Sequence, residues 1–174
     1  MKYAFALGLL LVVLVPLAAL EGRDDRARED TLVKFKGGIG VDPVSNVIVA
    51  AGTTTVHPNT VQGISPPGQI WRIADLTADV SLEGRIRVEG RGLLLAGGNG
   101  IGTNANQSVF ATLFCSGVAS SSTVSGVPLE PDGDFKIDDL LSPLPSTPCD
   151  TPVLLIRNVA GDWFAAGIED IDSE

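Results

Sequence analysis

The stretch from Gly84 to Cys115, GRIRVEGRGLLLAGGNGIGTNANQSVFATLFC, has two alternating segments on either side of a loop rich in glycine and asparagine. In the first segment Ile86 and Val88 alternate with arginines and a glutamate, which is the two-residue period of a half-buried strand. The second segment, residues 108–116, also alternates, and Cys115 shares the parity of its small apolar residues. The stretch therefore predicts two strands joined by a long turn, with a bulge at Gly90 or Gly92 in the first.

Residues 97–107, GGNGIGTNANQ, form the loop between these segments. Glycine and asparagine adopt positive φ at low cost, so this loop turns, and more than once. A phosphate-binding loop would have to open a helix, whereas the residues that follow alternate as a strand. A two-residue turn would have joined the strands, and long connections are often kept for binding, although this one could simply cross between two sheets. We expect a candidate binding loop that offers hydrogen bonds to a polar partner, such as a glycan or another envelope protein, from Gly98, Asn99, Gly100, Asn104 and Asn106.

The first 19 residues have the pattern of a secretory signal peptide. Lys2 gives a positive start, a long apolar run follows, and Pro16 precedes a small-residue cleavage site after Ala19. The alternative is a retained membrane anchor, since the run is about as long as the shortest spanning helices, near 17 residues. Residues 20–31 are charged and lack apolar periodicity, which predicts a solvated leader. We expect a secreted or periplasmic protein without a membrane span after cleavage.

The remaining chain predicts one β domain at 32–169 and an acidic tail at 170–174. The whole chain carries a formal net charge of −9 and few aromatic residues. Such a protein lacks the basic surface that nucleic acid or anionic lipid requires. The sequence does not predict an oligomeric state.

The two cysteines, Cys115 and Cys149, predict one disulfide bond in an oxidising compartment. A catalytic thiol would need a histidine partner, and His57 is the only histidine in the chain. His57 precedes Pro58, which favours extended backbone in a loop or an edge segment, and it has no companion for a zinc site. The acids of residues 132–139 do not have the spacing of a calcium-binding loop. We expect no metal, cofactor or catalytic residue.

Other segments predict further strands and turns. Aspartates at 75 and 79 should face the arginines of residues 85–91 across a hairpin that turns at Glu83-Gly84. Residues 46–51, NVIVAA, are typical of a short buried strand. Two more hairpins are expected, one joining 127–130 to 134–137 and one joining 153–159 to 163–168.

Many short strands punctuated by Gly and Pro predict an all-β antiparallel fold, either a Greek-key sandwich or a small barrel, with one disulfide. KGGIGV, the central GRGLLLAGGNGIGTNANQSVFATLFC and the closing PVLLIRN with WFAAGI resemble a group of short secreted bacterial proteins of unknown function. The resemblance covers residues 35–168. It implies export and a single domain, and it carries no activity or catalytic residue.

The missing catalytic constellation favours a non-catalytic binding or structural module of the cell envelope or extracellular space. One alternative is a carboxylate-based hydrolase, which would need two acids facing each other across a cleft. The other is a β-barrel carrier of a small apolar ligand, which would need a closed apolar cavity.

Overall fold

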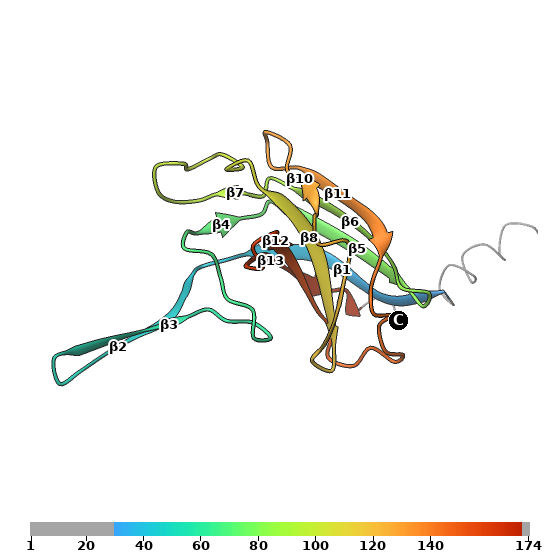
Figure 1. The fold of residues 1–174 in the computed structure, drawn as a ribbon, viewed down its shortest axis with the longest axis horizontal. Helices are drawn as coiled ribbons and strands as arrows, with labels where there is room; N and C mark the ends of the chain where they lie inside the picture. Colours follow the sequence, from blue (N-terminus) through green and yellow to red (C-terminus); the bar gives the residue numbers. More distant parts are fainter. Residues whose placement is uncertain (1–29, 172–174) are drawn as a thin grey trace, which may run out of the picture.

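The structure is a computed structural model that describes residues 30–171, and Figure 1 shows its fold. The predicted signal peptide at 1–19, nearly all of the predicted leader at 20–31 and most of the predicted tail lie outside the described residues. The described part is an all-β antiparallel fold, as predicted. Within it, no helix has the length and apolar character needed to cross a membrane.

The strands are short and are joined by turns that carry glycine at positive φ. In chain order they are β1 (Thr31–Gly40), β2 (Val44–Ala50), β3 (Thr53–Pro58), β4 (Trp71–Arg72), β5 (Asp75–Ser81), β6 (Arg85–Arg91), β7 (Leu94–Leu95), β8 (Ser108–Cys115), β9 (Val118–Ser121), β10 (Val127–Pro128), β11 (Phe135–Leu140), β12 (Val153–Asn158) and β13 (Trp163–Glu169).

One large sheet wraps into a nearly closed barrel. Its strand order is β10-β8-β12-β13-β1-β5-β6-β11, with β9 also paired to β8. The two ends of this order approach each other, because Ser121 and Ser142 exchange backbone hydrogen bonds of 3.0 and 2.8 Å between the end of β9 and the residues after β11. Of the two predicted architectures, the barrel describes the protein. We call the line where β9 and β10 approach β11 the seam.

The interior of the barrel is filled by one apolar cluster. Alternate residues of β5 and β6 point into it, including Leu76, Val80, Ile86 and Val88, which are all at most 1% exposed. β8 and β12 are buried on both faces over most of their length, as their continuous apolar runs suggest. The segment between β12 and β13 turns as predicted, and these two strands pair.

The hairpin of β5 and β6 turns at Glu83-Gly84, as predicted, and places Asp79 opposite Arg87. Asp75 likewise lies opposite Arg91, so the two charged faces meet as predicted, but within residues 30–171 neither aspartate forms an ion pair with the arginine opposite it. Asp79 instead pairs with Lys34 of β1 at 3.7 Å, and Arg85 pairs with Asp138 of β11 at 2.7 Å. The sequence could not show that β5 also pairs with β1 and that β6 also pairs with β11. Lys34 of β1 and Asp138 of β11 therefore form the ion pairs with Asp79 and Arg85.

Two further expectations are wrong. Residues 127–130 and 134–137 do not form a paired hairpin, because β10 pairs with β8 and β11 pairs with β6. The turn between them does form, with the backbone N–H of Gly133 donating to the carbonyl of Glu130. The bulge expected at Gly90 or Gly92 is also absent from the ladder of β5 and β6, which runs without a break through Gly90. Gly92 lies just beyond the end of β6, where the chain leaves the ladder with a φ of 64°.

The segment 46–51 is exposed, although its sequence predicted a buried strand. Residues 46–50 belong to β2, which among the described strands pairs only with β3, and every residue of both strands is exposed. Figure 1 shows this two-stranded ribbon extending away from the barrel. We call it the projecting hairpin. An apolar run predicts a strand but does not determine whether another element covers it.

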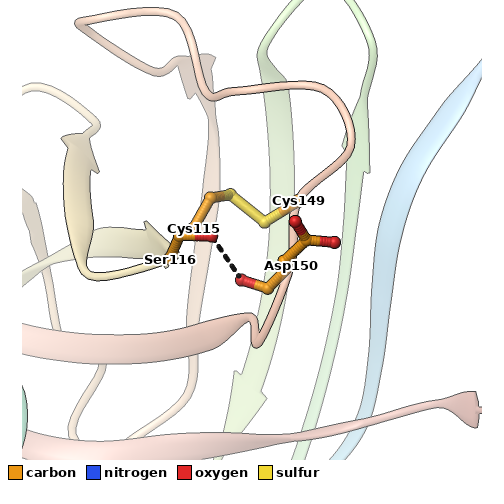
Figure 2. The surroundings of a disulfide bond; sticks show 4 residues. All are labelled: Cys115, Ser116, Cys149 and Asp150. Atoms are coloured by element: carbon orange, nitrogen blue, oxygen red, sulfur yellow. Dashed lines mark hydrogen bonds between the residues drawn. A yellow bond between two sulfur atoms is a disulfide. The ribbon is translucent and has the colours of Figure 1, made fainter.

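The disulfide between Cys115 and Cys149 is present, as predicted, with a Cα–Cα distance of 4.7 Å. Figure 2 shows the bond together with the hydrogen bonding between Ser116 and Asp150. The backbone N–H of Ser116 donates to the carbonyl of Asp150 at 2.7 Å. These contacts join the proline-rich segment 141–152 to the end of β8.

Candidate functional site

The loop of residues 97–107 is held in place by its own hydrogen bonds. Leu95 and Thr103 are joined by a backbone hydrogen bond of 2.9 Å, and the N–H of Gly102 donates to the carbonyl of Leu95 at 2.8 Å. The hydroxyl of Thr103 donates to the carbonyl of Gly100 at 2.7 Å. The loop therefore has a defined shape while most of its residues remain exposed.

The predicted binding residues of this loop have different environments. Gly98, Asn99 and Asn106 are exposed and Gly100 is half-buried. The side-chain amide of Asn104 donates to the carbonyls of Leu129 and Glu130, both at 2.9 Å, and its oxygen accepts the N–H of Asn106. Asn104 thus ties the loop to the segment before β11, and its amide donors are already used within the chain.

A shallow open depression of about 270 Å³ lies beside this loop. We call it the aromatic depression, because the stacked rings of Trp71 and Phe164 lie at its base, with centroids 4.1 Å apart, although both side chains are buried. Backbone hydrogen bonds from Trp71 to Val41 and from Val41 to Phe164 hold β4 against β13. The full lining is Pro67, Gly68, Gln69, Trp71, Leu95, Ala105, Gln107, Asn158 and Phe164.

Three carboxamide side chains line the aromatic depression, and no charged residue does. Gln69 is exposed, Gln107 is half-buried and Asn158 is buried. The oxygen of Asn158 accepts the N–H of Asp162 at 2.9 Å, and its amide group makes no hydrogen bond within residues 30–171, so it is available to donate. A carboxamide can both donate and accept hydrogen bonds, so this lining suits a neutral ligand with hydroxyl or amide groups.

Sequence reasoning found one wall of this depression and missed the rest. Ala105 and Gln107 belong to the predicted loop, whereas Gln69, Trp71 and Phe164 come from distant parts of the chain. Ala105 and Asn106 have positive φ, at 48° and 51°, which is uncommon for residues other than glycine. The asparagine at 106 was a signal for this conformation, but nothing local to Trp71 or Phe164 indicates that they stack.

A second concavity, of about 440 Å³, runs along the seam. We call it the seam groove, and Glu89, Gly90, Arg91, Val127, Pro128, Glu130, Asp134, Phe135 and Lys136 line it. Two of its three carboxylates are engaged: Lys136 hydrogen-bonds Glu89 at 2.8 Å, and Asp134 accepts the N–H of Gly92 at 3.0 Å, whereas Glu130 is exposed. The hydrogen bond from Lys136 lowers the pKa of Glu89, which favours the ionised form, whereas a general acid must hold its proton.

Buried polar groups elsewhere are satisfied within the chain. Arg157 of β12 donates to the carbonyl of Gly161 at 2.7 and 3.0 Å and to the hydroxyl of Thr112 at 3.3 Å. Its guanidinium also lies over the ring of Phe110, 5.1 Å from the centroid. Burial lowers the pKa of Arg157 from its usual value. Arg157 therefore stabilises the turn between β12 and β13.

Among residues 30–171, no three His, Cys, Asp or Glu side chains lie close enough together to hold a metal ion. His57 is exposed on β3 of the projecting hairpin. Comparisons of this chain with known protein families, with curated proteins and with solved structures find no match. The resemblance to short secreted bacterial proteins stays a prediction.

Proposed function

We propose that this protein is an exported, non-catalytic binding module that holds a neutral polar ligand, such as a glycan, in the aromatic depression. The observation that carries the proposal is the combination of three carboxamides and no charged residue in one depression, which two stacked and buried aromatic rings support from behind. A neutral sugar has an apolar C–H face and hydroxyl groups that donate and accept. The carboxamides of Gln69, Gln107 and Asn158 suit the hydroxyl groups, although the amide of Gln107 also donates to the carbonyl of Ala105 at 3.3 Å. The rings of Trp71 and Phe164 are 4% and 2% exposed, so they give the depression a rigid base and offer a ligand almost no aromatic surface.

Two sequence features support export to the periplasm or the extracellular space. The apolar segment before Ala19 has the composition of a signal peptide. The bond between Cys115 and Cys149 is typical of proteins in oxidising compartments. A ligand in that setting would be a glycan of the envelope or of the surroundings.

The alternatives receive less support from the geometry. A carrier of a small apolar ligand would need space inside the barrel, and an apolar cluster fills that interior. A carboxylate hydrolase would need a protonated acid beside an ionised one. In the seam groove, Glu89 is held ionised by Lys136.

The proposal is tested by retention of the pure protein in gels that contain a neutral polysaccharide, followed by calorimetry on any polysaccharide that retards it. Gln69→Ala and Gln107→Ala should each weaken binding by about tenfold, the equivalent of one lost hydrogen bond of about 1.4 kcal/mol. Asn99→Ala and Asn106→Ala test whether the exposed loop rim contributes. Thermal stability should stay close to that of the native protein in the Gln69 and Asn99 variants, whose side chains make no hydrogen bond within residues 30–171.

Asn46→Ala is the matched control, because Asn46 is an exposed carboxamide on the projecting hairpin, outside the depression. Its affinity should equal that of the native protein. Absence of binding to every neutral polysaccharide, or equal binding by the Gln69, Gln107 and Asn46 variants, would contradict the proposal.

A further inference from the structure

The projecting hairpin is the largest feature of the fold that the aromatic depression leaves unexplained. Its large apolar side chains are open to solvent: Val47 is 51% exposed, Val49 71% and Val56 55%. Val47 lies opposite Val56 in the ladder, so the three valines share one face of the ribbon. Within residues 30–171, β2 and β3 pair only with each other, so no described strand occupies the outer edge of either one.

The hairpin also lacks charge. No Asp, Glu, Lys or Arg lies between Asp42 and Arg72, in a chain whose net charge is −9. Soluble proteins commonly protect an open strand edge with Lys, other charges or Pro. β2 has none of these, while β3 ends at Pro58. The outer edge of β2 is therefore an unprotected template for another strand.

A lipid bilayer does not fit this ribbon. Both edges of a two-stranded ribbon carry unpaired N–H and C=O groups, and each would cost several kcal/mol in hydrocarbon. A charged partner does not fit it either, because the ribbon has no Asp, Glu, Lys or Arg to complement a charge, and His57 is its one titratable side chain. The fitting occupant is an uncharged strand edge that supplies hydrogen bonds and β-branched side chains.

We propose that this occupant is β2 of a second copy of the chain, so that two projecting hairpins join edge to edge as a four-stranded antiparallel sheet. An antiparallel strand pairs with itself about a two-fold axis, which makes the interface isologous. Full overlap of the seven residues Val44–Ala50 places Val47 of one copy opposite Val47 of the other. The valine faces of the two ribbons then form one continuous apolar surface.

Charge repulsion does not oppose this arrangement. A strand of seven residues is about 23 Å long, and full overlap leaves the two acidic barrels at opposite ends of the joined sheet. Repulsion between exposed charges falls off over about 8 Å at physiological ionic strength. One strand ladder buries less area than the roughly 1,200 Å² of a stable interface, so the dimer is weak and depends on concentration.

Cysteine cross-linking tests the register. Cys115 and Cys149 are bonded to each other, so a cysteine introduced by Val47→Cys is the one free thiol in the chain. Residues directly opposite in an antiparallel ladder have Cα atoms about 4.5–5.5 Å apart, within the range for a disulfide. We expect mild oxidation to give a covalent dimer that migrates at twice the native mass under non-reducing conditions.

Val56→Cys is the matched control, since Val56 is paired with Val47 on the same face and is about as exposed. In the joined sheet the two β3 strands are three strand spacings apart, about 14 Å, too far for a disulfide. Val47→Cys should therefore cross-link several-fold more than Val56→Cys. Equal cross-linking by the two variants would overturn the proposal.

Sedimentation at rising protein concentration tests association without an added thiol. The native protein and Val49→Thr should shift toward a dimer, whereas Val49→Lys should remain monomeric because it places a charge at the joined sheet. Since the projecting hairpin is exposed throughout, none of these variants removes a buried contact. A native protein that stays monomeric up to millimolar concentration would overturn the proposal. Flotation of the native protein with neutral phospholipid vesicles, lost in Val49→Lys, would also overturn it.

Discussion

Gly90 shows how one position without a side chain can determine local packing. It lies in the middle of β6, where glycine is ordinarily unfavourable because it adds chain entropy and contributes no packing. A Cβ built at Gly90 would lie 2.1 Å from Cε1 of Phe135, so the ring occupies the space that a side chain would need. Phe135 is 4% exposed, so this close approach closes the core beneath β11.

Gly90→Ala should lower the free energy of unfolding by about 1–3 kcal/mol, because the added methyl group displaces the Phe135 ring from a well-packed core. Urea denaturation followed by tryptophan fluorescence measures the loss. Gly68→Ala is the control, since no atom lies within 4 Å of a Cβ at that exposed position. A denaturation midpoint for Gly90→Ala equal to that of Gly68→Ala would contradict this account of the packing.

At the scale of the elements, the seam is where the barrel depends on a few specific contacts instead of a full ladder. β11 pairs with β6 on one side, and on the other side β11 and the residue after Leu141 meet the end of β9 and the connection that follows it through isolated bonds. One of them is the backbone N–H of Thr123 donating to the carboxylate of Asp139 at 2.8 Å. This bond lowers the pKa of Asp139, with smaller contributions that include the N–H of Leu140.

The lowered pKa of Asp139 gives a prediction with a definite sign. A carboxyl whose pKa is lower in the folded state stabilises the fold above its unfolded pKa of about 4, and this contribution is lost as the pH falls through the folded value. Asp139→Asn should therefore be less stable than the native protein at neutral pH. The difference should shrink steadily once the pH falls below about 5.

Thermal unfolding of both proteins from neutral to acid pH measures this difference. Glu83→Gln is the control, because Glu83 is exposed in the β5–β6 turn and has no hydrogen bond or ion pair within residues 30–171. Its stability difference from the native protein should be small at every pH. A constant difference for Asp139→Asn across the whole range would show that the charge of Asp139 is not what holds the seam.

At the scale of the whole molecule, a closed body and an open appendage are combined in one chain. The barrel buries its apolar residues and has the disulfide at the end of β8, whereas the projecting hairpin leaves its valines in solvent. The segment 141–152 contains four prolines and no strand, so it contributes little regular hydrogen bonding of its own. The disulfide bond between Cys149 and Cys115 therefore restrains the segment 141–152, which is not a strand of any sheet.

The variant with both Cys115→Ser and Cys149→Ser should lose about 3–4 kcal/mol of unfolding free energy, the chain-entropy value for a closed loop of 34 residues. That is a large part of the roughly 5–15 kcal/mol typical of a domain. Urea denaturation of the variant and of the native protein under reducing conditions should give the same lowered midpoint. An unchanged midpoint would mean that the segment 141–152 is held by its other contacts alone.

The sequence by itself determined most strands, most turns and the disulfide. Strands and turns depend on residues close in the chain, and the two cysteines can pair only with each other. Alternation in β5 and β6 and the glycine at 84 are local signals of this kind. Only the tertiary structure decided which strands are neighbours, that residues 46–51 are exposed, and that Trp71 and Phe164 meet beside Gln107. An apolar run such as NVIVAA has the same local pattern whether or not another element covers it, since burial is a property of the partner and not of the run itself.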